Sequence, residues 1–413
     1  MKLSDFDYHL PKNLIAQKPI RPRDHSRLLV CIRRRATNAA HPNSIRTRRP
    51  AKCGAHPNGN RNRGNFKIEH KYFYDIIDYL HKSDVLVLNN SKVFPARLIG
   101  KKIPTGGRIE VFLLKKNNPL PAQAGPYPPY HGGKKSPRPP LLKGASEVWQ
   151  CLVGGKNRRE GQKIKFSQSL KAEIIKDNQD GAWQVKFNQT GAKFKKLIQA
   201  IGQVPLPPYI KRKAGQPFKL DSKDYQTVYA DPKKLGSVAA PTAGFHFTPA
   251  LFKKIKNKGV QIEFITLHVG LGTFAPIKFD DISKHKMQEE WVEVPGDTLK
   301  RIVKAKQEGR RIIAVGTTSV RTLEKVLRNK RGLAPLKGAK PLQDFHGWVN
   351  IFIHPGFKFK VVDAIITNFH LPKSTLLMLV SAFAGKHNID KAYESAIKNK
   401  YRFYSYGDAM LII

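Results

Sequence analysis

Cysteine is scarce in this chain: Cys31, Cys53 and Cys151 are the three cysteines among its 413 residues. They show no C-x-x-C spacing, so the sequence contains neither a disulfide framework nor a common zinc-binding pattern. His41 and His56 flank Cys53, but their spacing fits no common zinc motif either. We therefore expect a reduced protein without a metal.

Long hydrophobic runs are also missing. The longest apolar stretch, LLMLVSAFA at residues 376–384, is far shorter than the roughly 20 residues needed to span a membrane. The opening residues, MKLSDFDYHLP, contain no apolar core of a secretory signal. We therefore expect a cytoplasmic protein without membrane contact. We also expect a monomer, although no residue pattern bears on the oligomeric state.

Acidic residues are few: 30 Asp and Glu stand against 75 Lys and Arg, for a formal net charge of +45. This excess predicts a polyanionic partner, most simply a nucleic acid, although a solvated surface adapted to an unusual cytoplasm would also explain it. Residues 31–66 and 115–146 together contribute fifteen of these charges and hold no acid. Both stretches lack apolar periodicity, and we expect them to be disordered or polyproline-like insertions. Most of the basic character therefore belongs to the folded body.

The length suggests two domains, or one large domain with an insertion. Between residues 95 and 205, β-rich runs such as GGRIEVFLL and AWQVKFN alternate with polar turns, which is typical of a small antiparallel barrel or sandwich. Elsewhere apolar strands alternate with helical segments, which is typical of an α/β layer. We predict an α/β layered main domain, residues 1–94 and 206–413, interrupted by a smaller inserted antiparallel β-barrel domain, residues 95–205.

Two glycine-framed histidines stand at the ends of one predicted helix–strand unit, His246 in PTAGFHF and His268 in TLHVGLGTF. Thr248 followed by proline predicts the helix N-cap, and Gly259 predicts the helix end. A mostly apolar strand then leads to His268. Open α/β sheets bind ligands just beyond the carboxyl ends of their strands, which is where this histidine is expected.

Three further strand-then-loop units repeat the pattern. They are VLVLNNSK (85–92), which ends in two asparagines, RIIAVGTTSVRTLE (311–324), and VVDAIITNFHLPKST (361–375), which carries Asn368, His370 and a helix cap near Ser374. We expect these polar loops to meet at one edge of a sheet. The Gly-Thr-Thr-Ser turn precedes a helix, whose free N–H groups would suit a carboxylate or a phosphate.

Each of these features also has a simpler structural explanation. A lone histidine is more often structural than catalytic, and the Gly-Thr-Thr-Ser turn could be a capped turn and nothing more. Arg321 and Glu324, three apart on one helix face, could pair with each other. The sequence has no P-loop, no nucleophile elbow and no complete dinucleotide-binding glycine motif.

Together the motifs resemble one family closely, the S-adenosylmethionine:tRNA ribosyltransferase-isomerases of the queuosine pathway. The resemblance is carried by LSDFDYHLPKNLIAQKPIRPRDHSRLLV, LVLNNSKVFPARL, GSVAAPTAGFHF, TLHVGLGTFAPI, GTTSVRTLE, NFHLPKSTLLMLVSAFAG and YRFYSYGDAM, and it covers nearly the whole chain apart from the two insertions. It implies transfer of the ribosyl part of S-adenosylmethionine onto 7-aminomethyl-7-deazaguanine at the wobble position of tRNA. Rearrangement would give epoxyqueuosine, with release of adenine and methionine. It also implies an α/β domain interrupted by a β-barrel.

The implied chemistry needs a base for the C5′ proton beside the sulfonium, and an imidazole titrates in the right range. His246, His268 and His370 are the candidates, without a ranking. Departing adenine needs a proton donor, either a second imidazole or Glu324. S-adenosylmethionine enters as a cosubstrate, and no metal is implied.

Binding roles follow from the same resemblance. The methionine carboxylate would lie at Thr317, Thr318, Ser319 and Arg321, with Asn368 in the same pocket, and the sulfonium would lie against Phe245 and Phe274. Either phenylalanine could equally belong to the core. Arg97, Arg402 and Tyr404 would hold tRNA phosphates and stack its bases, although the C-terminal aromatic cluster could equally be packing.

One position departs from the family pattern His-x-Met-His-x-Glu. His285, Met287 and Glu290 match, but Gln288 replaces the second histidine. Glutamine does not exchange protons near neutral pH, so proton transfer lies elsewhere or this position only orients the substrate. Two other functions stay open, namely an RNA methyltransferase using the same cosubstrate and a non-catalytic basic RNA-binding protein.

Overall fold

A computed structural model describes residues 1–33, 66–117, 146–212, 219–270, 280–285, 287–328 and 342–413. The chain forms two compact units. The first comprises Met1–Asn90, Pro241–Leu267 and Pro276–Ile413, and the second comprises Ser91–Ala240 with His268–Ala275. The predicted fold class, an α/β layer with an inserted antiparallel barrel, is confirmed. The domain bounds at 95 and 205 stay a prediction.

The first unit is built on a nine-stranded mixed sheet. In spatial order its strands are β15 (Phe345–Val349), β13 (Glu290–Val294), β12 (Gln261–His268), β3 (Val85–Asn89), β14 (Ile312–Val315), β16 (Ala364–Asn368), β17 (Ala409–Ile412), β1 (Arg27–Arg33) and β2 (Phe66–Tyr72). The central strands β3, β14 and β16 are buried at every position, as expected for parallel strands covered on both faces.

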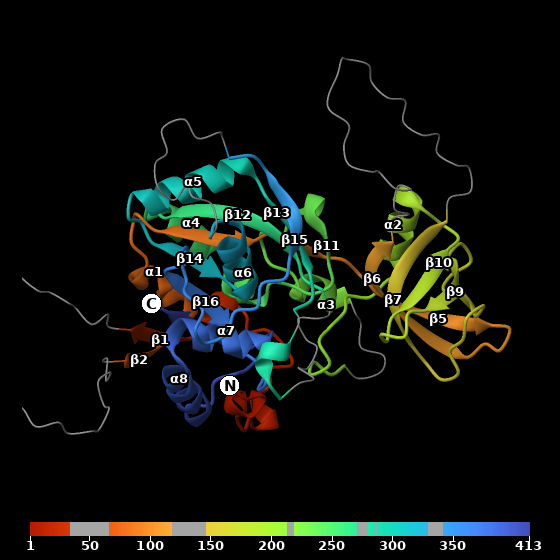
Figure 1. Ribbon diagram of the computed structural model, residues 1–413, viewed down its shortest axis with the longest axis horizontal. Helices are drawn as coiled ribbons and strands as arrows, with labels where there is room; N and C mark the ends of the chain where they lie inside the picture. Colours follow the sequence, from red (N-terminus) through yellow and green to blue (C-terminus); the bar gives the residue numbers. More distant parts are fainter. Residues whose placement is uncertain (34–65, 118–145, 213–218, 271–279, 286, 329–341) are drawn as a thin grey trace, which may run out of the picture. The chain divides into compact units, whose positions relative to one another are not determined.

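Six α-helices accompany this sheet in the described residues (Figure 1). They are α1 (Ile76–Tyr79), α4 (Pro249–Asn257), α5 (Gly296–Gln307), α6 (Thr317–Val326), α7 (Thr375–Ala384) and α8 (Lys386–Lys398). Helix α6 packs on β3, β14 and β16, while α7 packs on α8. Short 3-10 turns are η1 (Leu3–Phe6), η2 (Lys12–Leu14), η3 (Arg23–His25), η4 (Phe73–Asp75), η6 (Thr242–His246) and η8 (Ile282–Lys284).

Two predicted helix caps are confirmed. The Thr248 hydroxyl accepts a hydrogen bond from the Leu251 N–H, with proline at the first helical position of α4, and the Ser374 hydroxyl accepts one from the Leu377 N–H at the start of α7. Gly259 follows α4 with a φ of +86°, a left-handed conformation that favours glycine. Within the described part of the chain, no helix combines the length and the apolar character needed to cross a bilayer.

The second unit contains a closed six-stranded antiparallel barrel in the order β10-β7-β6-β5-β8-β9. The strands are β5 (Arg97–Ile103), β6 (Arg108–Asn117), β7 (Glu147–Gly154), β8 (Lys163–Lys165), β9 (Lys171–Asp177) and β10 (Trp183–Phe187). Also present are β4 (Lys92–Val93), which pairs with β11 (Leu235–Ser237), the helices α2 (Gly191–Ile201) and α3 (Lys219–Asp224), and the turn η5 (Pro232–Lys234).

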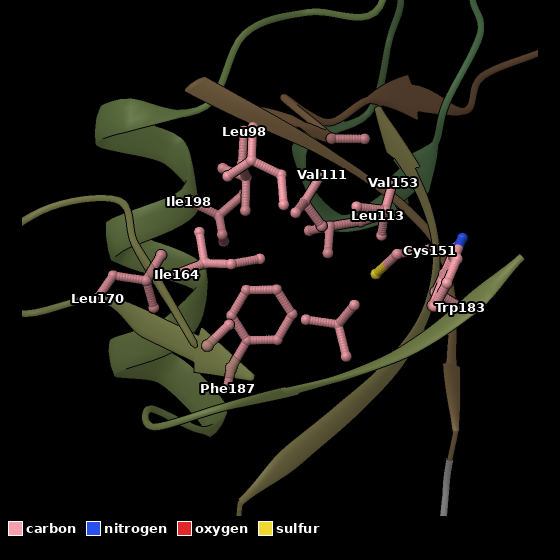
Figure 2. Close-up of a cluster of buried hydrophobic side chains, with 14 of the residues drawn as sticks. Leu98, Val111, Leu113, Cys151, Val153, Ile164, Leu170, Trp183, Phe187 and Ile198 are labelled. Carbon is pink, nitrogen blue, oxygen red and sulfur yellow. The ribbon is translucent and has the colours of Figure 1, made fainter. Parts of the chain in front are cut away.

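Alternation along the barrel strands separates core from surface. In β10, for example, Trp183, Val185 and Phe187 are buried while the residues between them are not. Figure 2 shows the resulting core, in which the barrel side chains Leu98 and Ile164 lie beside Ile198 of α2. The insertions predicted at 31–66 and 115–146 fall outside the described residues except at their ends. Residues 31–33 belong to β1, Phe66 belongs to β2 and residues 115–117 belong to β6, so these ends are strand and not loop, whereas Ser146 precedes β7.

Candidate active site

Four parallel strands of the first unit end at the same edge of the sheet. Strand β3 pairs in parallel with both β12 and β14, and β14 pairs in parallel with β16. Their carboxyl ends carry the polar residues singled out in the sequence, Asn89 on β3, Gly316 after β14 and Asn368 on β16. The predicted convergence of these strand ends at one sheet edge is confirmed.

His246 lies in a buried hydrogen-bonded chain at this edge. Its Nδ1 is 2.7 Å from the Ser26 Oγ, and its Nε2 is 3.1 Å from the Asn368 Nδ2. The Asn368 Oδ1 in turn accepts a hydrogen bond of 2.9 Å from the Thr242 hydroxyl. With the amide in this orientation, Asn368 donates to Nε2, so the proton of His246 is on Nδ1 and points to Ser26. Both ring nitrogens are therefore occupied.

His370 lies two residues beyond β16 and is also buried. Its Nε2 is 2.8 Å from the Thr367 Oγ1, and its backbone N–H donates to the Tyr393 hydroxyl at 2.8 Å. The Tyr8 hydroxyl donates to its carbonyl oxygen. The main chain at His370 is thus fixed from both sides.

Both histidines are held in the neutral form. Burial, together with the positive charges of the neighbouring Arg23 and Arg402, lowers the pKa of His246 to about 3. Burial alone lowers the pKa of His370 to about 3. Desolvation disfavours the imidazolium because a buried cation loses its hydration. Near neutral pH these rings therefore act as hydrogen-bonding groups without charge.

The start of α6 presents polar groups beside η6. Gly316 has a φ of +85°, and a Cβ placed on it would lie 3.5 Å from the Thr318 Oγ1 and 3.6 Å from the Ala243 Cβ. The first N–H groups of a helix lack intrahelical acceptors and carry a positive partial charge. Among the described residues, the buried Thr318 hydroxyl also has no hydrogen-bond partner. The backbone N–H groups of Thr317, Thr318 and Ser319 and the unpartnered Thr318 hydroxyl thus lie together at the start of α6.

Arg321 and Glu324 do not pair with each other, contrary to the simpler explanation of their spacing. Arg321 forms a buried ion pair with Glu290 of β13, and its Nε donates to the Ile351 carbonyl. The Glu324 carboxylate accepts hydrogen bonds from the backbone N–H groups of residues 360–362 at 3.0–3.2 Å. The sequence does not indicate this role, because those N–H groups belong to a distant loop.

His268 is the last residue of β12, and it belongs to the second unit. A Cβ placed on Gly236 would lie 3.0–3.2 Å from the His268 ring atoms, so the half-buried imidazole packs directly on this glycine. The following residue, Val269, donates its N–H to the Ser237 Oγ at 2.9 Å. The glycine thus leaves the space that the imidazole occupies.

The aromatic candidates differ in their surroundings. Phe245 is buried, stacks on Tyr406 at 5.9 Å between ring centroids, and has the Arg23 guanidinium over its face at 5.0 Å. A cation already occupies that face. Phe274 lies outside the described residues. Gln288, the departure from the family pattern, is exposed.

The three tRNA-binding candidates are already engaged within the protein. Arg97 forms a bidentate pair with Glu110 at 2.7 and 2.9 Å. The Arg402 guanidinium donates to the Lys18 carbonyl, and burial lowers its pKa. Tyr404 is buried, with a φ of +70°. Within the described residues, no group of three or more His, Cys, Asp or Glu side chains is placed to hold a metal ion.

Comparison with known proteins gives consistent matches. A family model described as "Queuosine biosynthesis protein" matches residues 3–47 and 60–412. The chain is 44% identical, over the full length of both chains, to an S-adenosylmethionine:tRNA ribosyltransferase-isomerase of Halothermothrix orenii, and 45% identical over the full length to one of a Sulfurihydrogenibium species. It is also similar to the crystal structure of an S-adenosylmethionine tRNA ribosyltransferase from Thermotoga maritima. The identity is 33%, the TM-score is 0.47, and the match covers 99% of this chain and 100% of that one.

Proposed function

The chain belongs to the family of S-adenosylmethionine:tRNA ribosyltransferase-isomerases, and from this we propose that it makes epoxyqueuosine in tRNA. It would transfer the ribosyl part of S-adenosylmethionine to 7-aminomethyl-7-deazaguanine at the wobble position and rearrange it. The aminomethyl nitrogen gains a bond to carbon and loses a proton, adenine leaves with a proton on a ring nitrogen, and methionine leaves with the sulfur electron pair. The observation that carries this proposal is the identity of 44–45% over the full length of enzymes of that name.

The proton acceptor is best sought at His268. A general base works best when its pKa is close to the working pH. Burial holds the pKa values of His246 and His370 at about 3, and both ring nitrogens of His246 are occupied. His268 is half-buried, unlike the other two candidates, and we propose it as the base. Alanine at this position should lower kcat about 10²–10⁴-fold, the range associated with loss of a general base.

The anion site for the methionine carboxylate is proposed at the start of α6. Its support is the free N–H groups of the first helical turn and the buried, unpaired Thr318 hydroxyl. Arg321 would contribute less charge than a free arginine, because Glu290 neutralises it. Backbone N–H groups already donate to the Glu324 carboxylate. We therefore do not propose Glu324 as the proton donor to the departing adenine.

The neutral His246 and His370 would have a positioning role. Their hydrogen bonds fix the main chain and the Asn368 amide at the end of β16, beside the proposed anion site. Because neither ring carries a charge, neither repels a sulfonium cation. The tRNA substrate would place the reaction in the cytoplasm.

One incubation tests the proposal. The protein is mixed with S-adenosylmethionine and tRNA that carries 7-aminomethyl-7-deazaguanine, and the small-molecule products are separated by chromatography. Release of adenine and methionine is expected. Formation of S-adenosylhomocysteine would instead indicate a methyltransferase, and tRNA binding without consumption of the cosubstrate would indicate a binding protein.

A further inference from the structure

The second unit contains a cleft of about 1150 Å³ on the outside of its barrel. One wall is the outer face of β5, β6 and β8, and the other is the segment 203–212. Two backbone hydrogen bonds between Arg97 and Gln203, of 2.8 and 3.1 Å, attach this segment to β5. The cleft is thus built from ordered backbone within one unit.

Three cations stand side by side across the strands of this cleft. Lys101 of β5 is the direct cross-strand partner of Arg108 on β6 and also of Lys165 on β8. Directly opposed residues point to the same face, and neighbouring strands lie about 4.8 Å apart, so the row spans about 10 Å. We call Arg108, Lys101 and Lys165 the basic row.

The basic row is not neutralised by the protein. The acidic side chain in the cleft, Glu110, is bound to Arg97, and Arg212 at the cleft wall is bound to Asp221 at 2.7 Å. Across the described residues, no acidic side chain pairs with a member of the basic row, and all three members are exposed. Like charges directly opposite each other destabilise a sheet. An anion lying across all three cations would offset this repulsion.

Apolar surface accompanies the charges. Ile99 and Phe112 lie on the same outer face, Phe166 follows β8, and Pro205 and Pro207 come from the opposite wall. Single-stranded nucleic acids are held by grooves that combine phosphate-binding cations with flat apolar or aromatic side chains. The cleft has both components.

We propose that this cleft binds the sugar-phosphate backbone of the RNA substrate along the basic row. The substrate class rests on the proposed function, since that reaction acts on tRNA. A single small anion would need one or two cations, whereas a repeating row one strand apart suits a repeating polyanion. Contacts of this kind supply affinity without reading sequence.

The test measures tRNA binding to the full chain as a function of salt. In the variant Lys101→Ala/Arg108→Ala/Lys165→Ala, the slope of log Kd against log salt should fall by about 2–3, because each phosphate contact contributes about 0.7–0.9. Affinity at low salt should fall about 10–100-fold. The matched control, Lys176→Ala/Lys193→Ala/Lys196→Ala, removes the same charge from exposed positions of the same unit outside the cleft and should leave the slope unchanged.

Two further measurements keep the outcome unambiguous. The melting temperature of the triple variant should be no lower than that of the wild type, because the variant removes opposed like charges. If the triple variant fails to fold, the single variant Lys101→Gln should reduce the slope of log Kd against log salt by about 0.7–0.9. With saturating modified tRNA, kcat should be unchanged while KM for tRNA rises.

An unchanged salt slope would overturn the proposal and leave the cleft to another polyanion, such as an acidic protein. If the wild type releases no adenine, the proposed function is overturned instead. The salt slopes would still decide whether the cleft binds RNA.

Discussion

Acidification should destabilise the first unit through its two buried neutral histidines. In the unfolded chain a histidine titrates near pH 6.5, whereas burial lowers the folded pKa of His246 and of His370 to about 3. Between pH 6.5 and pH 3 each of these histidines is protonated in the unfolded chain but not in the folded chain. The free energy of unfolding is therefore highest above pH 6.5 and decreases as the pH falls from 6.5 towards 3.

The size of the effect follows from the two pKa values. Between pH 7 and pH 5, each histidine should lower the free energy of unfolding by about 2 kcal/mol, and the pair by about 4 kcal/mol. Both side chains are more than nine-tenths buried, so solvent does not screen the effect away. Asp408 acts in the opposite direction, since burial raises its pKa and its protonation favours the folded state.

Urea unfolding at pH 7 and pH 5 tests this reasoning. Far-UV circular dichroism reports mainly on the first unit, which contains the helices α4–α8. The variant His370→Gln can keep the hydrogen bond to Thr367 but cannot titrate, so it should lose about 2 kcal/mol less than the wild type between the two pH values. His9→Gln, at an exposed position, is the control and should behave as the wild type. If His370→Gln loses as much stability as the wild type, the neutral buried state is refuted.

Three further predictions concern single contacts. Gly236→Ala should displace the His268 ring by a few tenths of an ångström and lower kcat at least about tenfold if His268 is the base. The control is Gly107→Ala, whose new Cβ would make only ordinary contacts and should leave kcat unchanged. Steady-state kinetics and thermal melting compare the two variants. Glu290→Gln should lower the free energy of unfolding in urea by about 3–5 kcal/mol, because Arg321 stays buried and charged. Lys300→Ala, which removes the exposed pair with Asp297, is the control and should leave the stability nearly unchanged. Asn368→Ala should cost about 1–3 kcal/mol by leaving the His246 Nε2 unpaired, and a cost near zero would mean that this bond does not stabilise the fold.

Local sequence patterns predicted the elements of the fold well, because their causes are local. The continuous apolar runs VLVLN, IIAV and AIITN are buried parallel strands, and the caps at Thr248 and Ser374 begin α4 and α7. The convergence of the strand ends was predictable as well. Parallel pairing necessarily brings carboxyl ends to one edge.

The partners of the site residues could not be predicted, because they come from distant parts of the chain. Ser26 reaches His246 because β1 begins at the edge where β16 ends, a consequence of sheet order. Helical spacing allowed Arg321 to pair with Glu324, but β13 brings Glu290 to the arginine instead. For Arg321 a short-range pair was possible, and the order of the strands in the sheet provided another partner.

Charge shows the same distinction between composition and register. The net charge of +45 indicates a polyanionic partner but gives no location, and Lys101, Arg108 and Lys165 stand in unremarkable sequence surroundings. The β5–β6 and β5–β8 registers place them directly opposite one another, whereas a shift of one residue in either strand pair would send a cation to the barrel core. Because Leu98, Val111 and Ile164 must fill that core, the packing that closes the barrel also fixes the basic row. The same registers that make the barrel stable therefore set the spacing of the cations that we propose contact RNA.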